Sequence, residues 1–157
     1  MDGTNYVAAA ALRTFNAPII CFSPVRWAEA DRLRLLMRGI ARDRDVFFLE
    51  EAVEAEAASL RIVPCPVTGV QVVTPMLPRQ VVKDDGVDDR RAALDLLLAR
   101  TGAAIAWYAG AEAPAYSRHV AWLATLHDDA GEASRTTPLD RAAAAAPGAQ
   151  ILPLTPA

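Results

Sequence analysis

The sequence predicts an α/β domain with a mainly parallel β-sheet. Short apolar runs without polar alternation recur along the chain, which is typical of strands that are buried on both faces. Charged segments with apolar residues at helical spacing separate several of these runs. The length of 157 residues is sufficient for one domain with one substantial core.

The first strand–helix–strand unit follows the opening residues. Residues 18–22 (PIICF) and 46–49 (VFFL) are continuous apolar runs, and each is expected to form a buried strand. Residues 28–42 between them predict a helix. Its apolar stripe consists of Leu33, Leu36, Met37 and Ile40. A strand, a helix and a second strand in this order indicate a βαβ unit.

Two β-branched runs in the middle of the chain predict a hairpin. Residues 60–63 and 70–74 flank the loop PCPVTG, and Gln71 alternates with valines in the second run. The acidic, alanine-rich residues 52–59 indicate a connection, and the segments MLPRQ and KDDGVDD after the second run indicate loop.

The second half of the chain continues the alternation. A helix is expected over residues 88–100, with Asp88 as its N-cap. Residues 104–108 (AIAWY) predict the next buried strand, and residues 120–126 (VAWLATL) predict another. Residues 110–119 are expected to form a short helix between them.

These elements divide the chain into three parts. Residues 1–16 indicate an N-terminal leader, and residues 17–129 indicate one α/β domain. Residues 130–157 are rich in alanine and proline and indicate a C-terminal tail.

The charge of the chain disfavours general nucleic-acid binding. The net charge is −3 and the pI is near 5.3, whereas phosphate binding needs a basic face. One local arginine strip is interleaved with Glu29, Asp31 and Asp43, which indicates a solvated helix face. The strip consists of Arg26, Arg32, Arg34, Arg38, Arg42 and Arg44.

The composition also predicts what kind of partner the protein has and in which compartment it is found. Hydrophobic residues make up 53% of the chain, which favours a homo-oligomer or a protein partner that covers an apolar face. Cys21 and Cys65 do not form a disulfide framework. The first residues lack the basic start of a secretory signal, and no apolar run approaches the ~18–20 residues of a membrane span. The cytoplasm is therefore the expected compartment.

The fold class places candidate ligand-binding residues. Ligands of parallel sheets bind beyond the carboxyl ends of the strands. That rule indicates the segments 23–27, 50–51, 109–112 and 127–129. The ligand-binding candidates are Ser23, Arg26, Trp27, Arg32, Glu50, Glu51, His127 and Asp128.

Two of these candidates also have a structural interpretation. Arg26 can bind a phosphate or carboxylate, but a salt bridge to a nearby carboxylate such as Glu50 is favoured. Trp27 can stack on a ring, but a plug at the end of the sheet is favoured. His127 with Asp128 can form a His–carboxylate pair without a neighbouring nucleophile.

The motifs do not predict catalytic residues, a metal site or a cofactor. Glu50 and Glu51 are adjacent in a strand, so their side chains point to opposite faces and form a poor acid–base pair. His119 and His127 are eight residues apart, which matches no metal motif. No glycine-rich phosphate loop is present in the sequence.

The order of the motifs resembles the amino-terminal half of GT-B glycosyltransferases. The chain carries IICFSPVRW, a helix ending in LLMRGIAR, and then DVFFLEE, LRIVP, VQVVTPMLP and AIAWYAG. The resemblance covers roughly residues 17–129 and is to enzymes similar to family 4, which often lie in polysaccharide gene neighbourhoods. It implies a Rossmann-like three-layer sandwich with a mainly parallel sheet, of the GT-B N-terminal domain type.

The sequence departs from that family's pattern at several motif positions. The family's Ser-His is Ser23-Pro24 here, and its Gln-Arg-Pro-Gln-His is DRLRL, in which only Arg32 matches. The family segment VVYDCMDE corresponds to VAWLATLHDD, in which Asp128 and Asp129 replace the acidic pair. The residues after them are too few to build the family's second domain, which binds most of the nucleotide-sugar.

The resemblance therefore implies a glycosyltransferase-like domain that lacks the donor-nucleotide domain. We expect a non-catalytic binding or assembly module in polysaccharide or cell-envelope biosynthesis, with a sugar or nucleotide-sugar as its ligand. One alternative is the acceptor half of a split glycosyltransferase that a partner chain completes. A second alternative is a sensor domain for a nucleotide or a sugar phosphate.

Overall fold

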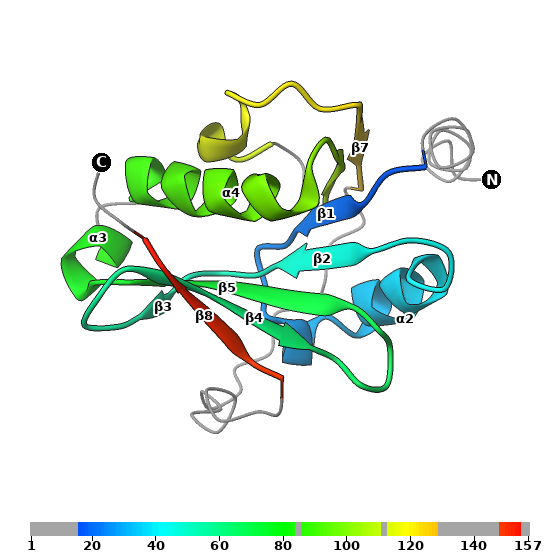
Figure 1. Ribbon diagram of the computed structural model, residues 1–157, viewed down its shortest axis with the longest axis horizontal. Helices are drawn as coiled ribbons and strands as arrows, with labels where there is room; N and C mark the ends of the chain where they lie inside the picture. Colours follow the sequence, from blue (N-terminus) through cyan, green and yellow to red (C-terminus); the bar gives the residue numbers. More distant parts are fainter. Residues whose placement is uncertain (1–15, 84–85, 111–112, 129–147, 155–157) are drawn as a thin grey trace.

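An eight-stranded mixed sheet forms the centre of the computed structural model, which describes residues 16–83, 86–110, 113–128 and 148–154 (Figure 1). Its strands are β1 (Ile19–Phe22), β2 (Val46–Leu49), β3 (Val53–Glu54), β4 (Ser59–Pro64), β5 (Gln71–Leu77), β6 (Ile105–Tyr108), β7 (Ala124–His127) and β8 (Gln150–Pro153). The prediction of an α/β domain with a mainly parallel sheet is confirmed.

The strand order is β7-β6-β1-β2-β5-β4-β8. The strands from β7 to β5 run parallel to their neighbours, and β4 is antiparallel to both β5 and β8. The short strand β3 pairs in parallel with the end of β5, beyond the residues that pair with β2. The predicted hairpin of β4 and β5 is present.

The helices α2 (Asp31–Ile40) and α4 (Val87–Thr101) cover opposite faces of the sheet. The other helical segments described are η1 (Trp27–Glu29), α3 (Arg79–Lys83) and η2 (Ala115–Ser117). Alternate side chains of β1 point to the two faces, so Ile19 and Cys21 pack on the α2 side while Ile20 and Phe22 pack on the α4 side. The sheet and these two helices therefore form a three-layer arrangement.

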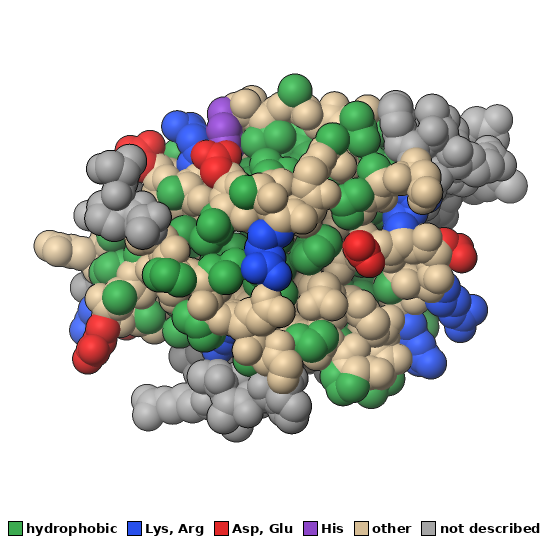
Figure 2. Space-filling view, in the orientation of Figure 1, with side chains coloured by type: hydrophobic (Ala, Val, Ile, Leu, Met, Phe, Trp, Pro, Cys, Tyr) green, Lys and Arg blue, Asp and Glu red, His purple; other side chains and the backbone are tan. Residues whose placement is uncertain are grey.

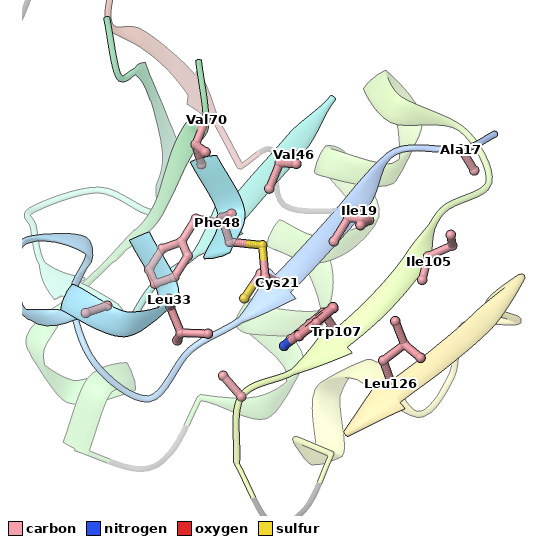
Figure 3. Packing of buried hydrophobic residues seen from close by; sticks show 13 residues of the cluster. Ala17, Ile19, Cys21, Leu33, Val46, Phe48, Val70, Ile105, Trp107 and Leu126 are labelled. Atoms are coloured by element: carbon pink, nitrogen blue, oxygen red, sulfur yellow. The ribbon is translucent and has the colours of Figure 1, made fainter. Parts of the chain in front are cut away.

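The core on the α2 side joins helix α2 to the four strands β1, β2, β6 and β7. Leu33 and Met37 of α2 are buried there, as the predicted stripe requires, and Leu36 and Ile40 pack at its margin. Figure 3 shows the buried residues around the β1 strand. The largest of those that come from strands are Ile19, Phe48, Ile105 and Trp107. Burial of such side chains contributes about 1.5–3 kcal/mol each to folding.

The core on the α4 side buries Ala93, Leu94 and Leu97 of that helix. The helix begins at Val87 after Gly86, whose φ of +46° is the left-handed conformation that glycine favours. Asp88 lies within the first turn and makes no side-chain cap, so its prediction as the N-cap is wrong. The turn at Gly86 starts the helix one residue earlier than expected.

The connection between β6 and β7 differs from its prediction. Over residues 113–119 the structure has only the 3-10 turn η2, because Pro114 before it is extended. Residues 111–112 lie outside the described residues. The strand predicted from residue 120 begins at Ala124, since Val120 closes a turn on Ser117 and the Trp122 indole donates to the Ser117 carbonyl at 3.1 Å.

The segment expected to be a tail contributes a strand. Residues 150–153 form β8, which pairs with β4, and Leu152 and Leu154 pack against the α4-side core. The Arg100 guanidinium also donates to the Gln150 side chain at 2.7 Å. The sequence did not predict this strand, because a run of four residues has too little pattern of its own to be distinguished from a loop. The rest of that predicted tail up to residue 147, and the predicted leader up to residue 15, lie outside the described residues.

Hydrophobic side chains also spread over the surface. In the orientation of Figure 1 they occupy much of the middle of the molecule, while most charged side chains lie toward its edges (Figure 2). The exposed large hydrophobic residues among those described are Leu35, Val67, Leu123 and Ile151. They come from different elements, and the expected homo-oligomer or protein partner stays a prediction.

Candidate functional site

A cavity of about 290 Å³ lies beyond the carboxyl ends of β1, β2 and β6. This strand-end cavity is lined by residues of the loops after those strands, by Arg90 of α4 and by Tyr116 of η2. Parallel strands end on the same edge of the sheet, so three separate loops meet there. Ser23, Glu50 and Glu51, three of the predicted candidates, line it together.

Aromatic rings form one wall of the cavity. Phe22, the last residue of β1, stacks on Tyr108 with ring centroids 5.1 Å apart and lies 6.0 Å from the ring of Tyr116. The Ser117 hydroxyl donates to the Pro114 carbonyl at 2.8 Å and is hydrogen-bonded to the Tyr108 hydroxyl at 3.1 Å, which helps to position the Tyr108 side chain. Burial raises the pKa of Tyr116 to about 12, so this phenol is neutral at ordinary pH.

Glu50 supplies a positioned carboxylate at the same cavity. Its Oε1 accepts a hydrogen bond from the Thr74 hydroxyl at 3.0 Å, and its Oε2 accepts one from the backbone N–H of Trp27 at 3.5 Å. Burial raises the pKa of Glu50 more than these hydrogen bonds and the nearby charges of Arg26 and Arg61 lower it. Glu50 is therefore held in place by hydrogen bonds, and burial makes its ionised form less favourable than in water.

A buried arginine, Arg61, lies next to the threonine that donates to Glu50. Arg61 of β4 is opposite Thr74 of β5 in the hairpin, and its Nη2 lies 3.5 Å from the Thr74 hydroxyl oxygen. Arg61 is only 9% exposed, and its charge lowers the pKa of Glu50. Among the described residues no ion pair joins Arg26 to Glu50, so the salt bridge predicted between them is not formed, although the Arg26 charge helps to lower the pKa of that carboxyl.

Ser23 and Glu51 complete the walls that the sequence predicted. The Ser23 hydroxyl donates to the Val25 carbonyl at 2.8 Å and accepts from the Val25 N–H at 3.1 Å, so it shapes its own turn. Glu51 is exposed and follows Glu50 directly. The Glu51 carboxylate therefore lies at the solvent-exposed side of the cavity, where a bound ligand can contact it.

Trp27 packs away from the strand-end cavity. Its ring meets Phe48 edge-on at 4.9 Å, within the α2-side core, and its indole hydrogen-bonds the Cys65 side chain. These contacts agree with the structural interpretation, in which the indole closes the end of the sheet. Its backbone N–H still helps to hold Glu50.

The three other candidates lie at the end of β7 or on α2 and do not line the cavity. Arg32 of α2 forms an ion pair with Asp128 at 2.8 Å, and the Asp128 N–H donates to the Tyr108 carbonyl at 2.7 Å. His127 is exposed, and its ring lies 5.0 Å from that of Tyr108. The Arg32–Asp128 pair therefore ties the start of α2 to the last parallel strand.

The described residues bring no metal-binding cluster together. No group of three His, Cys, Asp or Glu side chains in residues 16–83, 86–110, 113–128 and 148–154 is arranged to hold an ion. No helix within these same ranges is long and apolar enough to cross a bilayer.

Sequence reasoning missed Arg90, Tyr108 and Tyr116 as cavity residues. Tyr108 ends β6 and could have been found by the strand-end rule that selected Glu50. Arg90 and Tyr116 reach the cavity only through the packing of α4 and η2, for which the sequence carries no local signal.

Comparisons with known proteins leave the family open. No protein-family model matches the chain, and searches of the curated proteins and of the solved structures found no match.

Proposed function

We propose that this chain is a glycosyltransferase-like domain of the Rossmann-like GT-B type, which binds a sugar and does not catalyse transfer on its own. It would serve as a binding module in polysaccharide or cell-envelope biosynthesis. The motif order in the sequence motivates the family and pathway. The observation that carries the binding role is the strand-end cavity, where an aromatic wall and positioned carboxylates converge.

The walls of the cavity suit a sugar ring. The C–H face of a sugar packs on aromatic rings such as Phe22 and Tyr116, and its hydroxyls donate hydrogen bonds to carboxylates. The volume of about 290 Å³ is at the lower end of the range of ligand sites. It favours one sugar ring over a whole nucleotide-sugar.

The side chains around the cavity support binding without catalysis. Glu50 is hydrogen-bonded to Thr74 and to the Trp27 backbone and not to a nucleophile, and the Ser23 hydroxyl is committed to its own turn. The described lining residues include no cysteine or histidine. Cys21 lies in the core, where burial raises its pKa far above the ordinary value and keeps the thiol unreactive. A paired nucleophile and base is therefore not assembled by these residues.

Calorimetric titration with a panel of monosaccharides tests this proposal. We expect saturable binding, and we expect Glu51→Gln to weaken it by roughly two- to tenfold through loss of a charged acceptor. Glu56→Gln is the matched control, because Glu56 is an exposed carboxylate outside the cavity. Release of nucleotide from nucleotide-sugars by the purified chain would refute the non-catalytic role, and failure of every sugar to bind would refute the sugar site.

A further inference from the structure

Arg90 is the cationic side chain that lines the strand-end cavity. It projects from the first turns of α4, while the two carboxylates come from the loop after β2. Within the described residues no carboxylate forms an ion pair with Arg90. Its neighbour in the cavity is the phenol of Tyr116, which feels the Arg90 charge but stays neutral.

The carboxylates of the cavity do not neutralise Arg90. Glu50 is held by Thr74 and Trp27 and lies in the field of two other arginines. Glu51 is exposed, so water screens its charge. In the part of the chain that the structure describes, the positive charge on the α4 side of the cavity therefore has no carboxylate partner. A ligand can complement it, because a guanidinium binds carboxylate and phosphate groups through paired hydrogen bonds.

From this arrangement we propose that the ligand is an acidic monosaccharide, whose carboxylate or phosphate group binds Arg90 while its ring lies against Phe22 and Tyr116. The hydroxyls on the far side of the ring face Glu50 and Glu51. This inference rests on the proposed function and adds the charge of the ligand to it. A uronic acid and a sugar phosphate share this chemistry.

Calorimetry with matched sugars tests the inference at low ionic strength. The probes are glucose, galactose and mannose, their uronates, their 1-phosphates, and inorganic phosphate alone. We expect the uronate or the phosphate of at least one sugar to bind at least about tenfold more tightly than its neutral parent, as a hydrogen bond to a charged group requires. Whether uronates or 1-phosphates are preferred identifies the acidic group.

Substitutions at two adjacent arginines make the test specific. Arg90→Gln should abolish the preference for the acidic sugar over its neutral parent, and Arg90→Lys should retain part of that preference. Arg91→Gln is the control, because Arg91 follows on the same helix, pairs with Asp88 and does not line the cavity. Unfolding curves of each variant verify that it is folded.

The outcomes separate this inference from the proposed function. If a neutral sugar binds as tightly as its acidic derivatives, or if Arg90→Gln keeps the preference, the acidic ligand is wrong while the sugar site stands. If inorganic phosphate binds as tightly as the sugar phosphates, the ring contributes nothing and the inference fails. If no sugar binds, both fail together.

Discussion

The two cysteines differ sharply in their surroundings. Burial alone would raise the pKa of Cys65, but hydrogen bonds from the Thr68 hydroxyl, from the N–H groups of Thr68 and Val67 and from the Trp27 indole outweigh it and lower the pKa. Cys21 is fully buried, and burial raises its pKa. We therefore expect one thiol per chain to react with iodoacetamide at pH 7, and mass spectrometry to locate the adduct on Cys65.

Substitution of Thr68 tests the cause of that reactivity. Thr68→Val should slow labelling of Cys65 by roughly two- to tenfold, the equivalent of one hydrogen bond, and Thr68→Ser should restore most of the rate. Equal labelling of both cysteines in the folded chain, or an unchanged rate in Thr68→Val, would contradict this account.

Glu50 should make the stability of the chain depend on pH. Its pKa in the folded state is raised above the ordinary value of 4.5, so between the two values the folded state holds a proton that the unfolded state has lost. The free energy of unfolding, measured against Glu50→Gln as reference, should therefore fall as pH rises from about 4.5 through the raised pKa. At lower pH both states are protonated and the contribution is constant.

Urea titrations of the two proteins at several pH values between 4 and 8 measure this difference. Other groups titrate equally in both proteins, so they cancel. A difference that grows in favour of the wild type as pH rises would mean that hydrogen bonds and arginines dominate over burial at Glu50, and the account above would be wrong.

For single residues, the sequence predicts cavity side chains that directly follow a strand. It does not predict those that reach the cavity through the packing of a distant helix. Glu50 and Glu51 were predictable because buried strand β2 ends immediately before them. Trp27 was placed on the correct loop, but the side chain turns toward Phe48 because an indole gains more by burial than by facing the cavity. Arg90 depends on where α4 crosses the sheet, which no local pattern encodes.

Among the elements, β8 is the one whose contribution can be measured most directly. Leu152 packs on the α4-side core, while its neighbour Ile151 is 50% exposed on the other face of the strand. Leu152→Ala should lower the free energy of unfolding by about 1–2 kcal/mol, because its side chain is only half-buried. Ile151→Ala should change it by no more than about 0.5 kcal/mol.

Tryptophan fluorescence in urea measures both variants. Equal effects of the two substitutions would show that β8 does not pack on β4 in solution in the register Leu60 to Leu152. The comparison is controlled internally, since both residues belong to one strand and lose an aliphatic side chain.

The elements that the sequence predicted best are those with a self-contained pattern. The strands β1, β2 and β6 are continuous apolar runs, and α2 has a clear apolar stripe. The strand β3 has two residues and β8 has four, and each is defined only by its partner in the sheet. A pattern of that length carries too little information to separate a strand from a loop.

In the whole molecule the sheet separates two cores, and β1 supplies both of them. Ile19 lies in the α2-side core and Ile20 in the α4-side core, and both are fully buried. Ile19 is also paired directly with Ile105, which belongs to the same core. Adjacent residues of the chain therefore belong to different packing units, whereas residues far apart in sequence share one.

This separation predicts which double variants are additive. Each of Ile19→Val, Ile20→Val and Ile105→Val should cost about 0.5–1.5 kcal/mol of unfolding free energy. The costs of the first two should add within about 0.5 kcal/mol, because the backbone of the sheet stands between the two sites. Ile19→Val and Ile105→Val should deviate from additivity by more, since both enlarge the same space. Urea unfolding of the three single and two double variants measures this, and equal coupling in both pairs would show that the two faces act as one core.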